Sequence, residues 1–400
     1  MPALTSSPIG PAREQLPGLP DRELPPGGCA GLREFLAKVP DPRDPRGVRH
    51  TLASVLLISV AAVLAGARSF AAISEWAADA PPGVLAALGV RFDALAGRFQ
   101  PPGEATIRRV LESVDAGKLD AAISSWIAAA DPARPGRRAV AVDGKALRGT
   151  RHSSSDGQAL HLLAAIDQQA GTVLAQTDVA GKTNEITRFG PLLEPLDLAG
   201  CVVTADALHT QREHAEMLVT RMSAHYILVV KRNQPGLHAQ LAALPWKNVP
   251  AAARQRDRGH GREEDRALQA VTVTAGLAFP HAAQAIRITR RTRPLAGGRW
   301  RTVTVYAVTS LAFTQARPTE LAKWIRGHWQ IEALHHIRDV TYAEDASQIR
   351  TRNGPRVMTA LRNLAITLFR RTGHRNIAAA CRRHARNAAR TLTTLGLSPS

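Results

Sequence analysis

The 400-residue chain contains only three cysteines, Cys29, Cys201 and Cys381. They are odd in number and far apart, and none belongs to a Cys-x-x-Cys pair, so neither a disulfide framework nor a zinc finger is indicated. A Gly-rich phosphate loop is absent too, so the sequence does not indicate ATP dependence. No nucleophile-elbow motif supports Ser/His/Asp catalysis.

Long apolar runs are also scarce. Residues 1–15 are polar and contain several prolines, without the apolar core of a signal peptide. The one long run, residues 52–67, is too short to span a bilayer and predicts a buried helix. Together with the cysteine pattern, this indicates a cytoplasmic protein without a membrane partner.

Acidic residues are too few to balance the basic ones. Lysine and arginine number 52 against 33 aspartates and glutamates, a formal net charge of +19. Eleven of the arginines, and no acidic residue, lie between residues 346 and 400. Neutralising phosphates releases counterions and so drives association, which makes a polyanionic partner our expectation. A basic surface without a partner is the alternative.

Proline and glycine clusters divide the chain. Residues 1–30 are rich in both and are expected to be disordered. Helical patterns then fill residues 31–133, which predicts an all-α N-terminal domain closed by Pro132 and Pro135. The predicted helices are residues 31–38, 51–67, 70–78 and 105–130, the last in two pieces around residues 115–117.

After Pro135 the pattern changes to strand-forming residues. The order βββαβαβ mixes a meander with crossover connections and is the order of the RNase H-like fold. We therefore expect an α/β protein with an RNase H-like mixed sheet flanked by helices, built from residues 136–235 and 316–370. The predicted strands are residues 139–143, 161–166, 173–179, 201–206 and 226–230, and the helices are residues 185–196 and 210–222.

A second group of strands interrupts this pattern. Its alternating, β-branched residues are typical of half-exposed antiparallel strands, and they predict a β-rich insertion at residues 236–315. An amphipathic helix follows at residues 357–370. Residues 371–400 are expected to be a basic C-terminal tail, either helical or disordered. The predicted strands of the insertion are residues 268–274, 285–292 and 300–308.

Two aspartates each follow a run of strand-forming residues. Asp143 ends Ala-Val-Ala-Val, and Asp206 ends Val-Val-Thr-Ala. Sheets of α/β proteins hold ligands at such strand ends, and the expected order places the two strands side by side. Adjacent carboxylates repel unless a divalent cation neutralises them, and Mg²⁺, for which Mn²⁺ can substitute, prefers oxygen ligands. For either aspartate alone, a turn or helix cap is an equal alternative.

Glu332 is the single glutamate of a basic and aromatic helix at residues 324–340. With the two aspartates it makes a candidate three-carboxylate site that could hold two metal ions for an in-line displacement. His328, Glu332 and His336 share a helix face at i, i+4 spacing, with His335 beside them. Glu332-Ala-Leu-His335 also matches the Glu-x-x-His of di-iron bundles, but the second copy that such a site needs is absent. A solvated helix face is the remaining alternative.

Basic residues border this candidate site and could hold DNA phosphates without reading sequence. Each alone is better explained as a solvated charge, but their shared location favours a phosphate-binding group. The helix start at residues 181–185 could meet a phosphate, although Glu185 fits better as a capping-box acid. The acidic residues 260–265 are interpreted as a surface hairpin. The candidate DNA-binding residues are Lys145, Arg148, Lys182, Lys231, Arg232, Arg326 and His328.

These motifs resemble a known family, the bacterial insertion-sequence transposases of the DDE type, the kind that includes the H-repeat-associated proteins. The resemblance extends in order from about residue 32 to residue 369. It is carried by residues 141–149 (AVDGKALRG), 182–186 (KTNEI), 204–209 (TADALH), 226–231 (YILVVK), 260–262 (HGR), 328–332 (HWQIE), 339–345 (DVTYAED) and 363–366 (NLAI).

The resemblance implies that Asp143, Asp206 and Glu332 are the catalytic triad and bind two Mg²⁺ ions. It implies nicking at transposon ends, which frees a 3′-hydroxyl that then attacks target DNA. The partner implied is therefore double-stranded DNA, both transposon ends and target, and the location is the nucleoid. The N-terminal region, residues 31–133, would resemble the domain that accompanies this group and would help bind those ends. Synapsis of two ends implies a dimer during the reaction. A nuclease that cuts without joining and a decayed copy that only binds DNA remain alternatives.

The chain departs from the family pattern around the glutamate. The wider superfamily carries Tyr-x2-Arg-x3-Glu-x6-Lys, and here those positions hold Ile325, His328 and Asp339. The closer group has Asn directly after the glutamate and Trp where this chain has His336, and here Ala333 takes the Asn position. The triad is kept, but the departures leave open which side chains hold the flanking DNA strand.

Overall fold

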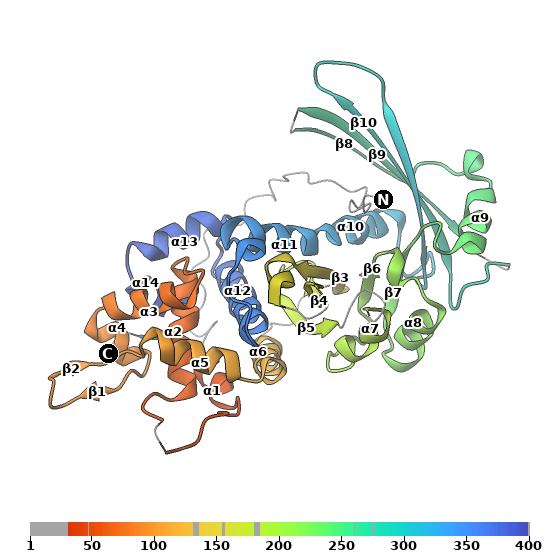
Figure 1. The fold of residues 1–400 in the computed structure, drawn as a ribbon. Helices are drawn as coiled ribbons and strands as arrows, with labels where there is room; N and C mark the ends of the chain where they lie inside the picture. The colour runs from red at the N-terminus through yellow and green to blue at the C-terminus, as the bar shows by residue number, and fades with distance from the viewer. Residues whose placement is uncertain are drawn as a thin grey trace.

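A computed structural model describes residues 31–46, 48–130, 136–153, 157–179, 185–259, 261–273 and 276–398. The predicted disorder of residues 1–30 and the predicted DNA contact of Lys182 lie outside these residues. The chain has a helical region at one end, a mixed sheet in the middle and a long antiparallel extension at the other end (Figure 1). No helix in the described part is both long and apolar enough to cross a membrane.

The helices predicted in the N-terminal region are present, with two additions, a short helix and a two-stranded hairpin. Three of the helices begin where a side chain caps the first turn: those of Thr51, Ser69 and Asp115 each accept a bond from a backbone N–H three residues on. The apolar run forms a helix that is almost wholly buried, as expected. The elements are α1 (Leu32–Ala37), α2 (Leu52–Leu64), α3 (Phe70–Asp79), α4 (Pro82–Ala87), β1 (Phe92–Asp93), β2 (Arg98–Phe99), α5 (Glu104–Ser113) and α6 (Ala116–Ala129).

Among the described residues, nine strands form one mixed sheet in the order β5-β4-β3-β6-β7-β11-β10-β9-β8. Strands β3, β6 and β7 are parallel, and the other neighbours are antiparallel. The second group of strands therefore continues the first sheet, because β11 pairs with β7. The strands are β3 (Ala139–Leu147), β4 (Leu160–Asp167), β5 (Val173–Val179), β6 (Val202–Ala205), β7 (His225–Val230), β8 (Ala253–Gly259), β9 (Arg262–Thr272), β10 (Gln284–Pro294) and β11 (Arg301–Thr309).

Helices cover both faces of the sheet, which confirms the expected α/β class. Side chains alternate between faces along β3. Asp143 points toward α11, whereas the next residue, Gly144, backs onto the start of α7. Helices α10 and α11 thus lie on one face, and α7 lies on the other against β4 and β5. The helices are α7 (Glu185–Leu193), α8 (Arg212–Glu216, continued by a π-turn at Met217–Arg221), α9 (Pro235–Ala243), α10 (Pro318–Gly327) and α11 (Trp329–Thr341).

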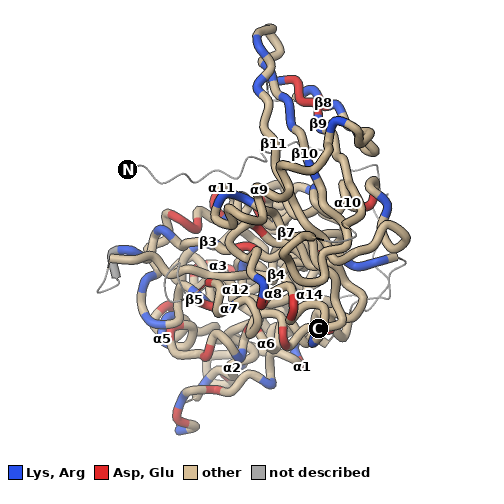
Figure 2. Tube along the Cα trace, turned by 90° about the vertical axis from the view of Figure 1, so that its right-hand side faces the viewer, with Lys and Arg blue, Asp and Glu red and all other residues tan. Residues whose placement is uncertain are grey.

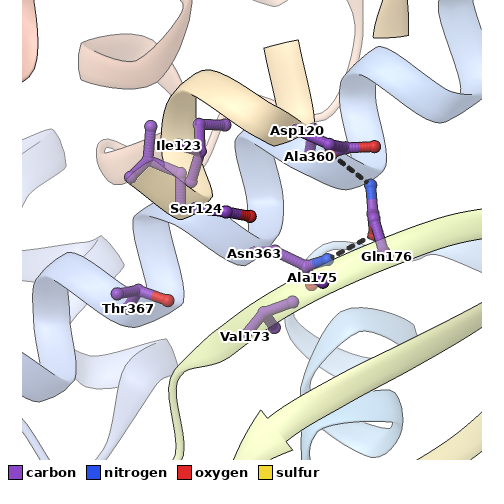
Figure 3. A pocket seen from close by; sticks show the side chains of 10 residues that line it. Asp120, Ile123, Ser124, Val173, Ala175, Gln176, Ala360, Asn363 and Thr367 are labelled. Atoms are coloured by element: carbon purple, nitrogen blue, oxygen red, sulfur yellow. Dashed lines mark hydrogen bonds between the residues drawn. The ribbon is translucent and has the colours of Figure 1, made fainter. Parts of the chain in front are cut away.

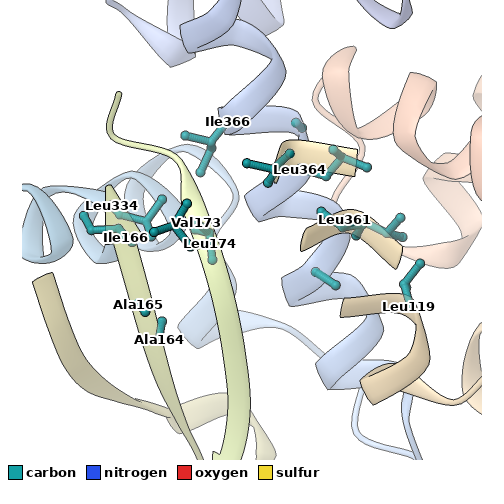
Figure 4. Close-up of a cluster of buried hydrophobic side chains, with 14 of the residues drawn as sticks. Leu119, Ala164, Ala165, Ile166, Val173, Leu174, Leu334, Leu361, Leu364 and Ile366 are labelled. Atoms are coloured by element: carbon teal, nitrogen blue, oxygen red, sulfur yellow. The ribbon is translucent and has the colours of Figure 1, made fainter. Parts of the chain in front are cut away.

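Helix α12 (Gly354–Arg371) joins the helical region to the sheet. It contacts α2, α5 and α6 on one side and β5 on the other, and its residues from Gly354 to Phe369 are mostly buried. Leu361 and Leu364 lie near Leu119 of α6, while Ile366 lies toward the sheet (Figure 4). The expected basic tail folds as two helices, α13 (Ile377–Ala385) and α14 (Ala389–Leu395), which pack against α2 and α12.

Candidate active site

Asp143 and Asp206 stand side by side because their strands are parallel neighbours. The register pairs Ala141 with Thr204 and Val142 with Ala205, so the next level of the ladder pairs the two aspartates. Neighbouring strands lie about 4.8 Å apart. Asp206 follows the last residue of β6, and its side chain accepts a bond of 2.9 Å from the backbone N–H of Leu208. Both aspartates belong to the face that α10 and α11 cover.

Helix α11 brings Glu332 to the same face. Ile331 and Leu334 are fully buried and fix the helix on the sheet, as expected for Ile331. One turn beyond Glu332, His335 places its Nδ1 atom 3.8 Å from Oδ2 of Asp143. His336 was predicted to share a helix face with Glu332, but it is exposed. His335 is the histidine that faces Asp143. The i, i+3 spacing of Glu332 and His335 was the only sequence signal for it.

Asp206 and Glu332 both affect the pKa of Asp143. Burial raises the pKa of Asp143 well above its usual value, and the charges of Asp206 and Glu332 raise it further. Burial also lowers the pKa of His335, so its ring is neutral at pH 7, and its buried Nε2 atom has no hydrogen-bond partner in the described part of the chain. Among the described residues, no three acidic, histidine or cysteine side chains already form a group that could hold a metal ion. The charges of the three carboxylates therefore act on one another, but the side chains are not arranged as a preformed set of metal ligands.

His328 joins the start of α11 to β6. Its Nδ1 atom lies 2.9 Å from the hydroxyl of Thr204, which also accepts a 2.8 Å bond from the Gln168 side chain. Gly327 makes this approach possible, since a Cβ there would collide with the Gln168 amide. Burial lowers the pKa of His328 to about 4, so the ring is neutral at pH 7. The geometry favours a structural role for His328 over the predicted phosphate contact.

Lys145 is buried and joins β3 to α11. Its ammonium lies 2.8 Å from Asp339 and 3.1 Å from Asp345. Two carboxylates therefore already bind the charge that was predicted to hold a DNA phosphate. Burial raises the pKa of Asp339, while Lys145 opposes that rise. The geometry favours Lys145 as a strand-to-helix contact over a DNA contact.

The other predicted DNA-binding residues differ in exposure. Lys231 and Arg232 are exposed directly after β7, at the same edge of the sheet as Asp206. Arg148 is also exposed, but its Nε atom lies 3.6 Å from Asp345. Arg326 instead donates to the side chain of Gln255 on β8. Lys231 and Arg232 are therefore the members of the set best placed to meet a phosphate near the aspartates.

Behind Asp143 lies a buried cluster of Glu185, His161 and His209 that was not predicted from the sequence. Glu185 accepts bonds from His161 at 2.7 Å and from His209 at 3.1 Å. These bonds lower the pKa of Glu185 to about 2 against the opposing effect of burial. The expected capping-box partner of Glu185 lies outside the described residues. The one sequence signal for this cluster was that Glu185 and His209 both lie in segments that resemble the transposase family.

The turn after Asp206 is also held from β7. Asn233 donates to the backbone carbonyl of Ala207 at 2.7 Å, and Gln234 donates to that of Thr210 at 2.9 Å. The hydroxyl of Thr210 in turn donates to the carbonyl of Val229 at 2.5 Å. The segment that follows Lys231 and Arg232 thus fixes the turn that carries Asp206.

Comparison with known proteins agrees with these motifs. Residues 33–127 match the "DDE_Tnp_1-associated" family model, and residues 134–368 match the model "Transposase DDE domain". "Putative transposase YncI" of Escherichia coli O157:H7 is 29% identical over 359 residues, 85% of this chain and 87% of that protein. "H repeat-associated putative transposase YhhI" of Escherichia coli K12 is 27% identical over 373 residues, 90% of this chain and 94% of that protein.

Among solved structures, a piggyBac transposase synaptic complex with hairpin DNA is similar at 12% identity, with a TM-score of 0.40 over 91% of this chain and 78% of that one. The match to the transposase model covers more than half of the chain and includes all three carboxylates. The chain belongs to the Transposase DDE domain family.

Proposed function

We propose that this transposase nicks transposon ends and joins the freed 3′-hydroxyls to target DNA with Asp143, Asp206 and Glu332 as its catalytic residues. One observation carries the assignment: the β3–β6 register sets the two aspartates side by side, where burial first and then the charges of Asp206 and Glu332 raise the pKa of Asp143. The order β5-β4-β3-β6-β7, with helices on both faces, supports an RNase H-like core.

The residues fit a hard divalent cation. Asp143 is a half-buried carboxylate with two other acids near it, so a bound cation would compensate its charge, and the donors are oxygens, which Mg²⁺ prefers. We propose that Asp143, Asp206 and Glu332 hold Mg²⁺. When bound, such ions stabilise negative charge on the attacking and leaving oxygens of a phosphodiester. Neutral His335 adds no competing positive charge beside Asp143.

We propose that DNA lies along the edge of the sheet where β6 and β7 end. Lys231 and Arg232 lie at this edge and would hold phosphates. Strand β11 pairs with Val230, the last residue of β7, at Tyr306, and residues 301–305 extend past that edge, by roughly 17 Å at 3.4 Å per residue. The arm made of β8–β11 therefore projects on the side of Asp206, about two strand spacings from it.

The far half of this arm is basic. Residues 254–266 and 290–301 contain ten arginines and four acidic residues. Figure 2 shows the arm projecting from the body with Lys and Arg along it. Five of these arginines pair with the arm's own acids, but positive charge remains in excess, so a duplex on the catalytic edge would run beside a basic surface that could bind phosphates without reading sequence. We also propose that the protein is a dimer during the reaction, because two transposon ends are joined in one event.

The test uses purified protein, Mg²⁺ and a labelled duplex that carries the inverted repeats flanking the gene. We expect wild-type protein to nick the ends and to join them to a second duplex. Asp143→Asn, Asp206→Asn and Glu332→Gln should each reduce both products to background and leave duplex binding unchanged. Glu213→Gln, an exposed carboxylate change on α8, is the control that keeps both products.

Each result separates the alternatives. Nicking without joined product would identify a nuclease, and binding without either product would identify a decayed copy. Nicking that persists in Asp143→Asn would exclude the assigned site. Wild-type activity that survives chelation of all divalent ions would exclude the metal.

A further inference from the structure

We propose that Glu185 is a positioning residue that sets the distance between the two catalytic aspartates from the opposite face of the sheet. The inference rests on the proposed function, since it takes Asp143 and Asp206 as the metal-binding pair. The buried His161–Glu185–His209 cluster carries it: one carboxylate binds a strand next to Asp143 on one side and the turn after Asp206 on the other.

The first contact supports the strand of Asp143. His161 on β4 is the register partner of Ala146 on β3, and its Nε2 atom lies 2.7 Å from Glu185. The pair lies directly behind Gly144: a Cβ there would be 2.5 Å from His161 Nε2 and 2.7 Å from Glu185 Oε1. The residue after Asp143 must therefore be glycine, because the carboxylate and the imidazole occupy the space of a side chain.

The second contact holds the turn of Asp206. His209 ends the short 3-10 turn at Ala207–His209, three residues after Asp206, and has no exposed surface. Its Nε2 atom lies 3.1 Å from Glu185, and its ring stacks on Phe189 of α7 with centroids 4.8 Å apart. The turn thus passes from the catalytic face to the α7 face and is held there by the first turns of α7.

The turn is held further by its neighbour His214. This ring also stacks on Phe189, at 4.3 Å, and its two nitrogens lie 3.1 Å and 3.0 Å from the carbonyls of His209 and Ile186. The start of α7 and the turn after β6 are therefore joined by several direct contacts. A change in the Glu185 carboxylate would shift Asp206 relative to Asp143 without touching either side chain.

An amide in place of the carboxylate separates this role from simple packing, and variants of His161, which leave the Glu185 charge near Asp143 in place, separate it from a direct effect of that charge. The Glu185 carboxylate accepts from both histidines, whereas a glutamine amide offers one acceptor oxygen and one donor nitrogen. The Glu185→Gln variant therefore keeps the shape of the side chain but can keep only one of the two bonds as they stand. Groups that orient metal ligands typically change metal affinity by roughly 10–100-fold when they are lost.

The experiment measures Mn²⁺ binding to the full-length protein by electron paramagnetic resonance without DNA, together with the Mn²⁺ dependence of nicking. Glu185→Gln should weaken Mn²⁺ binding by about 10-fold or more and raise the Mn²⁺ concentration for half-maximal nicking to match, with high Mn²⁺ restoring the rate. Glu194→Gln is the matched control: it lies just after the same helix, is 65% exposed and pairs with Arg221. It should bind Mn²⁺ like the wild type.

A second pair of variants keeps the test decisive if Glu185→Gln does not fold. His161→Gln retains an N–H donor near the Nε2 position, while His161→Leu removes it. Leu should weaken Mn²⁺ binding and Gln should restore most of it. Unchanged Mn²⁺ affinity in folded Glu185→Gln or His161→Leu protein would overturn the positioning role. Unchanged Mn²⁺ affinity in Asp143→Asn would instead overturn the proposed metal site itself.

Discussion

Ile325, His328 and Asp339, where the chain departs from the wider transposase pattern, each have a partner in the fold. Ile325 packs against a small apolar cluster between α10 and the sheet, His328 bonds Thr204, and Asp339 pairs with Lys145. A lysine ammonium thus does lie beside position 339, but β3 supplies it. These side chains hold α10 and α11 on the sheet, so phosphate contacts near Glu332 fall to other residues.

A prediction at this scale concerns Asp120, which lies in a buried polar cluster away from the carboxylates. Gln176 donates to Asp120 at 2.8 Å, and Asn363 donates to Gln176 at 2.8 Å, across α6, β5 and α12 (Figure 3). Burial raises the pKa of Asp120 to about 7, and Arg356 only partly opposes it. The folded protein therefore holds a proton that the unfolded chain, with a pKa near 3.8, has released.

Because the raised pKa belongs to the folded state, this contribution to stability is present below about pH 4 and is lost as the pH rises to about 7. The loss is at most about 4 kcal/mol. We expect the urea midpoint of the wild type to fall between pH 5 and pH 7.5, roughly the window of this titration, and Asp120→Asn to reduce that fall. Glu75→Gln, which changes an exposed acid on α3 that does not contact Asp120 or Arg356, is the control that keeps it. An equal fall in Asp120→Asn would contradict the assignment.

The side-by-side position of Asp143 and Asp206 could be predicted from sequence because its signal is local. Each ends a run of apolar, β-branched residues, and the order of the strands placed the two runs together. The Glu185 cluster could not be predicted, since its histidines lie 24 residues away on either side and no short spacing relates them. The neutral state of His328 likewise depends on burial that only the folded chain creates.

At the scale of elements, strand β8 was missing from the prediction for a physical reason. Its residues, Ala253–Gly259, are polar and half-exposed because β8 is the edge of the sheet, and arginines there oppose pairing with another chain. The surface hairpin predicted at residues 260–265 holds only in part: β8 and β9 do form a hairpin, in which Gly259 pairs with Arg262, but Glu264 and Asp265 lie within β9 and are buried.

We expect the tip of the arm to contribute to the salt dependence of DNA binding. Replacing Arg258, Arg299 and Arg301 by glutamine should reduce the magnitude of the negative slope of log K against log salt by about 3, since each lost phosphate contact removes about 0.9. All three are exposed. Fluorescence anisotropy with a labelled duplex at several salt concentrations measures the slope.

The control for this prediction replaces three exposed arginines on the other side of the sheet. Arg188, Arg212 and Arg221 lie on or beside α7 and α8. Their conversion to glutamine lowers the net charge by the same amount, but the magnitude of the slope of log K against log salt should decrease less. Equal slopes for the two triple variants would show that only total charge matters and that the arm has no contact of its own.

At the scale of the whole molecule, the two ends of the described chain pack together. Helices α13 and α14 lie on α2, while α12 passes between the N-terminal helices and the sheet. The charge pattern of residues 346–400 predicted a basic segment, but not that its apolar residues complete the helical region. Deleting everything after Gln348 would remove the buried helix α12 and therefore could not isolate a contribution to DNA binding.

A shorter deletion tests this arrangement. Ending the chain at Gly373 removes α13 and α14, which bury Ile377, Leu392 and Leu395. At about 1.5–3 kcal/mol for each side chain, the loss approaches the whole stability of a typical domain. We expect the truncated protein to melt at a clearly lower temperature and its helical region to become sensitive to protease.

Full-length protein with Arg382, Arg383 and Arg386 changed to glutamine provides the comparison for this deletion. These three side chains are exposed on or just after α13, so the melting temperature should stay near that of the wild type. Any loss of DNA affinity in that variant then reports on charge alone, because the packing of α13 on α2 is kept. A truncated chain that melts with the wild type would mean that α13 and α14 are an appended tail and that α2 and α12 are stable without them.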